Sequence, residues 1–84
     1  MKTFEGKWVD FADQIILVTE NKRSLEVRYH NGPGPFYGQT LNLYSFVINV
    51  DFEELSPSTG VLSDDENIIF WSNETKWTRV DCIL

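Results

Sequence analysis

The chain is poor in the residues that cross-link a small protein or bind a metal ion. Its 84 residues include one cysteine, Cys82, and one histidine, His30. A single cysteine forms no intramolecular disulfide, so the hydrophobic core must hold the fold, and we expect a reducing, cytoplasmic location. Zinc sites require clusters of cysteine and histidine, which are absent from the sequence. We therefore expect no metal and no cofactor.

Positive charge and long apolar runs are also scarce. Seven basic residues stand against 13 acidic ones, which gives a net charge of −6. Such a charge repels nucleic-acid phosphates and anionic membrane surfaces. No apolar run is longer than that of residues 15–18, whereas a membrane span needs roughly 20 apolar residues. The first residues contain no signal-peptide core. We expect a soluble protein that binds neither nucleic acid nor membrane.

No segment of ten or more residues keeps helical spacing, but several short runs alternate apolar and polar residues. Residues 25–30 (LEVRYH) place leucine, valine and tyrosine on one side of an extended chain. Residues 46–52 (FVINVDF) place Phe46, Ile48, Val50 and Phe52 on one side. Successive strand residues face opposite sides of a sheet, so this period of two indicates half-buried strands. We expect both sets of apolar side chains to point into the core.

Turn residues divide the chain into eight predicted strands. The strongest break is residues 31–35 (NGPGP), because proline and glycine cannot continue a ladder there. A two-residue hairpin is predicted at Asn73 and Glu74, and Gly38 should mark a bulge or make room for a neighbouring side chain. The predicted strands cover residues 4–11, 15–20, 24–30, 36–41, 46–52, 59–63, 68–72 and 75–80.

This arrangement predicts one all-β domain over residues 1–84, an antiparallel up-and-down meander. Closure into a barrel removes the exposed edges that make open sheets associate, so we expect a closed barrel of about eight short strands. A 42% hydrophobic content with three Trp, three Tyr and six Phe can supply a dense core. Barrels of about eight strands are filled by side chains or hold one small ligand. The short strands and bulky inward groups favour the filled interior.

The sequence Gly6-Lys7-Trp8 near the start, together with Arg79 in the last predicted strand, resembles the pairing found in lipocalin-like barrels, the calycins. This group has the avidins as relatives. In calycins the tryptophan closes one end of the barrel and the arginine packs across its ring as a cation–π contact. The resemblance implies a structural role for Gly6, Trp8 and Arg79. It implies a fold and a binding role, and no chemistry.

Catalytic groups are few. Nucleophilic mechanisms need a base beside a serine or cysteine. His30 lies on the polar side of a predicted strand and Cys82 lies in the tail. The acidic residues 51, 53, 64 and 65 are numerous enough for an acid–base pair, but so small a chain builds no deep cleft around them. Residues 64–67 (DDEN) lack the alternating spacing of a calcium loop, so we expect a solvated turn. We expect a protein that is not an enzyme.

The aromatic residues near the Asn–Gly–Pro loop and the last hairpin are the strongest functional candidates. Alternation places large rings on both sides of this hairpin, so one side is available for an exposed aromatic surface. Such a surface, flanked by Lys76 and Asn49, would stack on a sugar ring or anchor a protein partner. The alternative is that the loop buries these rings. The candidate ligand-binding residues are Tyr37, Trp71, Trp77 and Asn73.

Two functions follow from these observations. The first is a non-enzymatic module that binds a small molecule or a carbohydrate, with its site in the loops at one end of the sheet. The alternative is a protein–protein interaction or self-association domain, in which the same aromatic residues contact a partner or a second copy of the chain. A ligand module requires a concave pocket lined by rings, whereas an interaction domain requires a flat apolar patch or a free strand edge.

Overall fold

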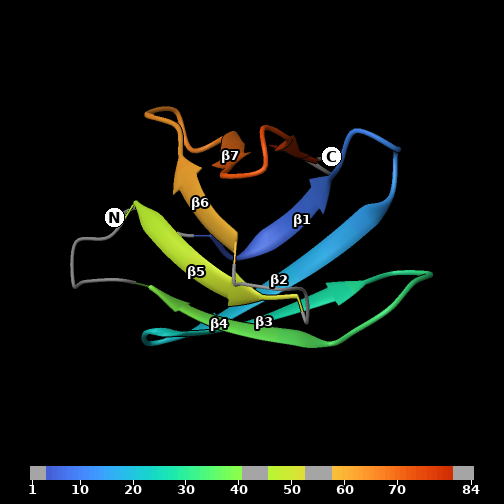
Figure 1. Cartoon of the computed structure of the whole chain (residues 1–84), viewed down its shortest axis with the longest axis horizontal. Helices are drawn as coiled ribbons and strands as arrows, with labels where there is room; N and C mark the ends of the chain where they lie inside the picture. Colours follow the sequence, from blue (N-terminus) through green and yellow to red (C-terminus); the bar gives the residue numbers. More distant parts are fainter. Residues whose placement is uncertain (1–3, 41–45, 53–57, 81–84) are drawn as a thin grey trace.

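The eight strands of the computed structural model form one closed antiparallel barrel. The structure describes residues 4–40, 46–52 and 58–80. Each strand pairs with the next in the chain, and β1 pairs with β8. Figure 1 shows this order as a continuous change of colour around the molecule. The all-β meander and its closure are therefore confirmed. The strands are β1 (Gly6–Val9), β2 (Ile15–Asn21), β3 (Ser24–Tyr29), β4 (Phe36–Thr40), β5 (Val47–Asp51), β6 (Ser58–Leu62), β7 (Ile68–Trp71) and β8 (Lys76–Arg79).

Alternation along the strands places the core inside the barrel. In β3, Leu25 and Val27 are 2% and 0% exposed, and in β5, Ile48 and Val50 are 1% and 0% exposed. These side chains pack in one cluster with inward residues of the other strands. None of the described residues belongs to a helix long and apolar enough to cross a membrane.

Phe46 is a correction to the predicted inward face of residues 46–52. Ile48 and Val50 are buried and Phe52 is half-buried against the core, as predicted, but Phe46 is 45% exposed. Its main chain still pairs, because the N–H of Leu62 donates to its carbonyl oxygen. However, β5 begins only at Val47, so the Phe46 ring lies beyond the last inward layer of side chains. Phe4 and Trp8 already fill this end of the barrel.

The first strand is shorter than predicted at both ends. It was expected over residues 4–11, but β1 ends at Val9 and Phe11 is 79% exposed. The cause is local, because Oδ1 of Asp10 accepts hydrogen bonds from the backbone N–H groups of Ala12 and Gln14, both at 2.9 Å. An aspartate that binds the backbone in this way turns the chain and ends the strand.

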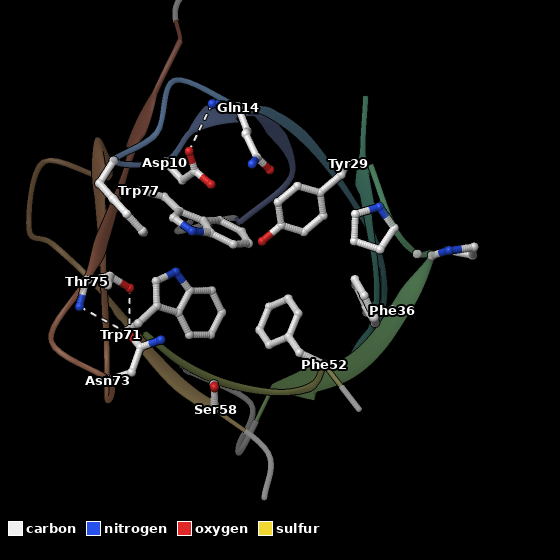
Figure 2. Close-up of a pocket in the computed structure, with 14 residues that line it drawn as sticks. Asp10, Gln14, Tyr29, Phe36, Phe52, Ser58, Trp71, Asn73, Thr75 and Trp77 are labelled. Carbon is white, nitrogen blue, oxygen red and sulfur yellow. Dashed lines mark hydrogen bonds between the residues drawn. The ribbon is translucent and has the colours of Figure 1, made fainter. Parts of the chain in front are cut away.

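The last hairpin has a longer turn than the two residues predicted. The N–H of Glu74 donates to the carbonyl of Trp71, and the N–H of Trp71 donates to the carbonyl of Thr75. Glu74 adopts a positive φ of 72°. Three residues, 72–74, therefore form the turn between the paired Trp71 and Thr75, in the manner of a type I turn followed by a left-handed residue. Asn73 lies at the tip of this turn, at the open end of the barrel (Figure 2).

One end of the barrel, here called the closed end, is filled by Phe4, Trp8 and Arg79. Trp8 is fully buried, and its Nε1 donates to the carbonyl of Phe4 at 2.9 Å. The guanidinium carbon of Arg79 lies 4.3 Å from the centre of the Trp8 ring. The same side chain donates to the carbonyl oxygens of Glu5 and Glu66, each at 2.8 Å. Arg79 thus joins three segments across the closed end.

Gly6 makes room for this arginine. Its φ of 144° is one that other residues rarely adopt, and a Cβ atom there would lie 2.6 Å from Nη1 of Arg79. The structural role that the sequence suggested for Gly6, Trp8 and Arg79 is therefore supported by direct contacts. On the opposite side of the barrel, Gly38 pairs with Val50 and makes room for its side chain, as expected for a glycine inside a strand.

Candidate ligand-binding site

The opposite end of the barrel, here called the open end, is hollow. A cavity of about 660 Å³ lies there between the turn after β1, the loop before β4 and the β7–β8 turn. This volume is within the range of small-molecule pockets. The sequence favoured an interior filled by side chains. This holds at the closed end and between the two ends, whereas the open end contains the cavity. Its lining residues are Asp10, Phe11, Gln14, Tyr29, Pro33, Gly34, Pro35, Phe36, Phe52, Ser58, Trp71, Asn73, Thr75 and Trp77.

Five aromatic rings form the wall and floor of the cavity. Four of them make a closed circuit of edge contacts: Tyr29 to Phe36 at 6.2 Å, Phe36 to Phe52 at 5.2 Å, Phe52 to Trp77 at 6.1 Å and Trp77 to Tyr29 at 6.3 Å between ring centroids. Trp71 completes the group, at 5.5 Å from Phe52 and 4.8 Å from Trp77. Figure 2 shows these rings arranged around one central space.

The rings come from strands on different sides of the barrel. Tyr29 ends β3, Phe36 begins β4 and Phe52 follows β5, while Trp71 ends β7 and Trp77 lies in β8. Each of these positions lies at, or within one residue of, a strand end that borders a loop at the open end. Because the sheet is closed, inward residues at one end of every strand must meet. The cage of rings is a direct consequence of closure.

Trp71 carries the one buried side-chain nitrogen or oxygen, among the described residues, that has no hydrogen-bond partner. The side chain is 5% exposed, and its Nε1 is the unpaired atom. In Figure 2 this nitrogen lies on the edge of the indole that faces Trp77. A buried donor without a partner costs about 1–3 kcal/mol. An acceptor atom that reaches this nitrogen would remove that cost.

Gly60 allows Trp71 to lie where it does. The two residues are paired across β6 and β7, and a Cβ atom on Gly60 would approach Cζ3 of the Trp71 ring to 2.9 Å. The indole therefore packs against the bare backbone of β6. A larger residue at this position would force the ring toward the cavity.

Polar groups stand at the rim of the cavity. Asp10 uses Oδ1 to bind the turn after β1, and its other carboxylate oxygen points toward the rings (Figure 2). Asn73 uses Oδ1 to accept from the N–H and the hydroxyl of Thr75, at 3.1 and 2.5 Å, so its amide nitrogen is turned away from the tip of the turn. Gln14 and Ser58 add an amide and a hydroxyl. The rim offers a few fixed polar groups above an apolar interior.

The structure brings three of the four candidate binding residues together. Trp71, Trp77 and Asn73 all line the cavity, next to the Gly–Pro loop as expected. Tyr37 does not join them, because it is 62% exposed and faces away from the barrel interior, one position after the inward Phe36. The flat outer surface that Lys76 and Asn49 were expected to flank is also not formed by the tryptophans, which are 5% and 4% exposed inside the barrel.

Sequence reasoning missed Tyr29, Phe36, Phe52 and Asp10 as cavity residues. Alternation had already placed Tyr29 and Phe52 on inward faces, so the signal for both was present. The sequence placed Phe36 only at the start of a strand. Phe36 pairs with Val27 of β3, so its side chain, rather than that of Tyr37, lies on the same inward face as Val27. The cavity wall could have been found by counting inward positions from each loop at one end of the barrel.

Other chemically interesting side chains lie away from this cavity. His30 does not line the cavity but lines a smaller neighbouring hollow, which shares Gln14 and Tyr29 with the cavity. The acidic segment 64–67 is a turn in which Asp65 accepts from the Ser63 hydroxyl at 2.6 Å and from the N–H of Asn67 at 3.1 Å. Within the described ranges, no group of three or more histidine, cysteine, aspartate or glutamate residues is placed to hold a metal ion. Cys82 lies outside the described residues.

Comparison of the chain with models of known families, with curated protein sequences and with solved structures finds no match.

Proposed function

We propose that this protein is a non-enzymatic module that binds a small ligand in the open end of its barrel. The observation that carries the proposal is a cavity lined by five aromatic rings, one of which, Trp71, has a buried Nε1 without a hydrogen-bond partner. Binding sites combine apolar walls with a small number of fixed polar groups in this way. A bound acceptor would satisfy the donor, and ring contacts would supply most of the binding free energy.

The closed end supports a relationship to lipocalin-like barrels. The contact of Arg79 with the ring of Trp8, beside Gly6, is the arrangement that the calycin resemblance implies. A barrel with one end sealed and the other open is also suited to hold a ligand along its axis. We infer that this chain is a short calycin-like barrel with a binding role.

The groups in the cavity favour binding over catalysis. Its described lining contains no histidine, cysteine or lysine, and its one carboxylate, Asp10, already binds two backbone N–H groups of its own turn. Acid–base catalysis of the glycosidase kind uses two carboxylates, whereas one carboxylate of the described residues lines this cavity. We further propose a cytoplasmic location, which is supported by the single cysteine of the chain.

Tryptophan fluorescence tests the proposal directly, because two of the three tryptophans line the cavity. The full chain is titrated with a panel of soluble sugars, small aromatic compounds and small amines. We expect at least one compound class to change the emission with saturation. The Trp71→Phe variant keeps a ring but lacks the N–H group, so affinity for a ligand that carries an acceptor should fall roughly 2–10-fold.

A matched control lies one residue away. Phe70 points outward from the same strand and is 48% exposed. Phe70→Leu should leave binding unchanged while making a similar change in side-chain size. An emission spectrum that no compound alters would count against ligand binding. Equal losses in the two variants would remove Trp71 from the site.

Self-association is the second candidate function, and a row of apolar side chains on the outer wall favours it. Val47 pairs with Val61, which in turn pairs with Phe70, across β5, β6 and β7. Val61 and Phe70 are 43% and 48% exposed. Exposed apolar patches mark association sites in many proteins. Sedimentation velocity over a range of concentrations decides between a monomer and a dimer, and Val61→Lys should abolish any dimer formed through this row.

A further inference from the structure

The cavity at the open end has a one-sided charge pattern. Among the described residues, its lining includes the carboxylate of Asp10 and no lysine, arginine or histidine. The chain as a whole carries a net charge of −6. Fields of this sign draw cations toward a cleft and repel anions. The charge pattern therefore favours a positively charged ligand.

The aromatic rings have the spacing of a cation cage. Neighbouring rings of Tyr29, Phe36, Phe52 and Trp77 have centroids 5.2–6.3 Å apart, and adjacent planes meet at 63–89°. A cation is attracted by the face of a ring when it lies within about 6 Å of the centroid. Rings steeply inclined to one another present faces and edges in several directions around the central space (Figure 2). This arrangement suits a compact rounded group better than a flat sugar, which stacks on a single open face.

Asp10 is held in place to act on such a cation from the rim. Two backbone N–H groups fix Oδ1, and the other oxygen is directed toward the rings (Figure 2). The carboxylate therefore needs no reorganisation when the ligand binds. Primary ammonium and guanidinium ions are strongly hydrated or demand several acceptors, and the cavity provides one carboxylate only. A methylated ammonium ion loses less hydration when it enters an apolar cage.

We propose that the open end recognises a trimethylammonium group that carries a nearby hydroxyl or carbonyl oxygen. The inference rests on the proposed ligand-binding function and names the class of ligand. The rings surround the trimethylammonium group, Asp10 balances its charge from the rim, and Nε1 of Trp71 donates to the oxygen of the ligand. The rings, the carboxylate of Asp10 and the N–H group of Trp71 then each contact one part of the ligand.

The test compares choline with 3,3-dimethyl-1-butanol, which has the same shape and hydroxyl group but no charge. Isothermal titration calorimetry on the full chain measures both, and we expect choline to bind at least about tenfold more tightly. The free amino acid Nε-trimethyllysine is a third arm. Tighter binding of trimethyllysine than of choline would indicate a modified peptide as the source of the group, and the reverse would indicate a free small molecule.

Two asparagine variants separate the role of Asp10 from net charge. Asp10→Asn retains an oxygen that can accept from Ala12 and Gln14, so the turn should persist. We expect it to weaken choline binding by roughly 3–10-fold and to leave dimethylbutanol binding unchanged. Asp13→Asn removes the same charge from the same turn, but Asp13 does not line the cavity. It should leave both affinities unchanged.

The outcomes distinguish this inference from the function on which it rests. Equal affinities for choline and dimethylbutanol would overturn cation recognition and leave small-ligand binding in place. Failure of these compounds and of the whole fluorescence panel would overturn both. Equal effects of Asp10→Asn and Asp13→Asn would show that net charge alone attracts the cation, and the assigned role of Asp10 would be wrong.

Discussion

At the scale of single residues, Trp8 and Trp71 show how the same side chain serves opposite ends of the barrel. Trp8 is fully buried with its Nε1 paired to the carbonyl of Phe4. Trp71 is almost as buried, but its Nε1 has no partner. The paired indole belongs to the stabilising core. The unpaired one lowers stability where it stands, and proteins retain such groups mainly at functional sites.

Trp8→Ala should destabilise the protein by about 3–5 kcal/mol, because it leaves a large cavity, an unpaired carbonyl at Phe4 and an arginine without its ring. Such a loss is comparable to the whole stability of a small domain. Urea unfolding measures it. Phe11→Ala, at a position that is 79% exposed, is the control and should keep the parent midpoint. An unchanged midpoint for Trp8→Ala would mean that the closed end does not depend on this ring.

At the scale of the elements, each strand divides into an inward and an outward set, and its connections decide where the strand stops. In β5, Ile48 faces the core, whereas Asn49 faces outward and its amide lies 3.5 Å from the hydroxyl of Thr59. Asp10 shortens β1, and the left-handed Glu74 lengthens the last turn. The strands are therefore set by alternation and the connections by individual polar side chains.

Matched charge substitutions in β5 test the alternation. Ile48→Asp should unfold the domain, because an unpaired carboxylate in the core costs several kcal/mol. Asn49→Asp should be tolerated on the outer wall. Far-UV circular dichroism and urea midpoints of the two variants give the comparison. Similar losses at both positions would contradict the register of β5.

The turn between β6 and β7 gives a pH dependence. Hydrogen bonds from the Ser63 hydroxyl and then from the Asn67 N–H hold the pKa of Asp65 below its ordinary value of 3.8. A lowered pKa in the folded state means that the contribution to stability is complete above about pH 4 and is lost as the pH falls through the folded-state value. Asp65→Ala should therefore lower the urea midpoint slightly at pH 7.

At a pH below the folded-state pKa of Asp65 the same substitution should have a smaller effect, because the parent carboxylate is then protonated as well. The control is Asp64→Ala, which removes the neighbouring charge at an exposed position of the same turn. The midpoint difference between parent and Asp65→Ala is measured at both pH values. A difference that grows toward low pH would show the opposite sign and contradict the assigned hydrogen bonds.

At the scale of the whole molecule, the pairing of β1 with β8 joins the first and last strands. It closes the sheet into a barrel with one filled end and one hollow end. Trp8 lies opposite Arg79 and Val9 opposite Thr78 in this pairing. Without it the sheet would have two free edges, and the rings of β8 would have no fixed relation to those of β3. Sealing the closed end and forming the cage at the open end both depend on this contact.

Closure is tested at Thr78, which pairs with β1 on one side and with β7 on the other. Thr78→Pro removes a backbone donor from the ladder and should abolish cooperative folding. Thr78→Val keeps the donor and the branched shape, and it should retain the parent midpoint. Thermal unfolding followed by circular dichroism distinguishes them. A Thr78→Pro variant as stable as the parent would mean that the barrel does not rely on β8 for closure.

Much of the fold was predictable because it depends on patterns that are local in the sequence. The alternation in residues 25–30 and the Gly–Pro loop located strands and turns without any knowledge of partners. Phe46 shows the limit of this reasoning. The alternation of residues 46–52 predicts an inward side chain at this position. However, β5 begins one residue later, and Phe4 and Trp8 already fill the closed end of the barrel. Occupancy at a barrel end depends on residues far away in the chain.

The candidate site was predicted only in part, for the same reason. Trp71, Trp77 and Asn73 were found because they lie close together in sequence, and Tyr37 was included where its neighbour Phe36 belonged. The cage itself needs rings from β3, β4 and β5 to meet those of β7 and β8. Their meeting depends on the stagger of the closed sheet, which no short stretch of sequence encodes.

By itself, the sequence determined that this protein is a single all-β meander with an apolar interior, because a period of two and frequent turn residues act over a few positions at a time. Only the tertiary structure decided that one end is sealed by Trp8 and Arg79 while the other is left hollow around the unpaired nitrogen of Trp71. That difference arises from which inward side chains meet when β1 closes on β8, and from how much volume they fill.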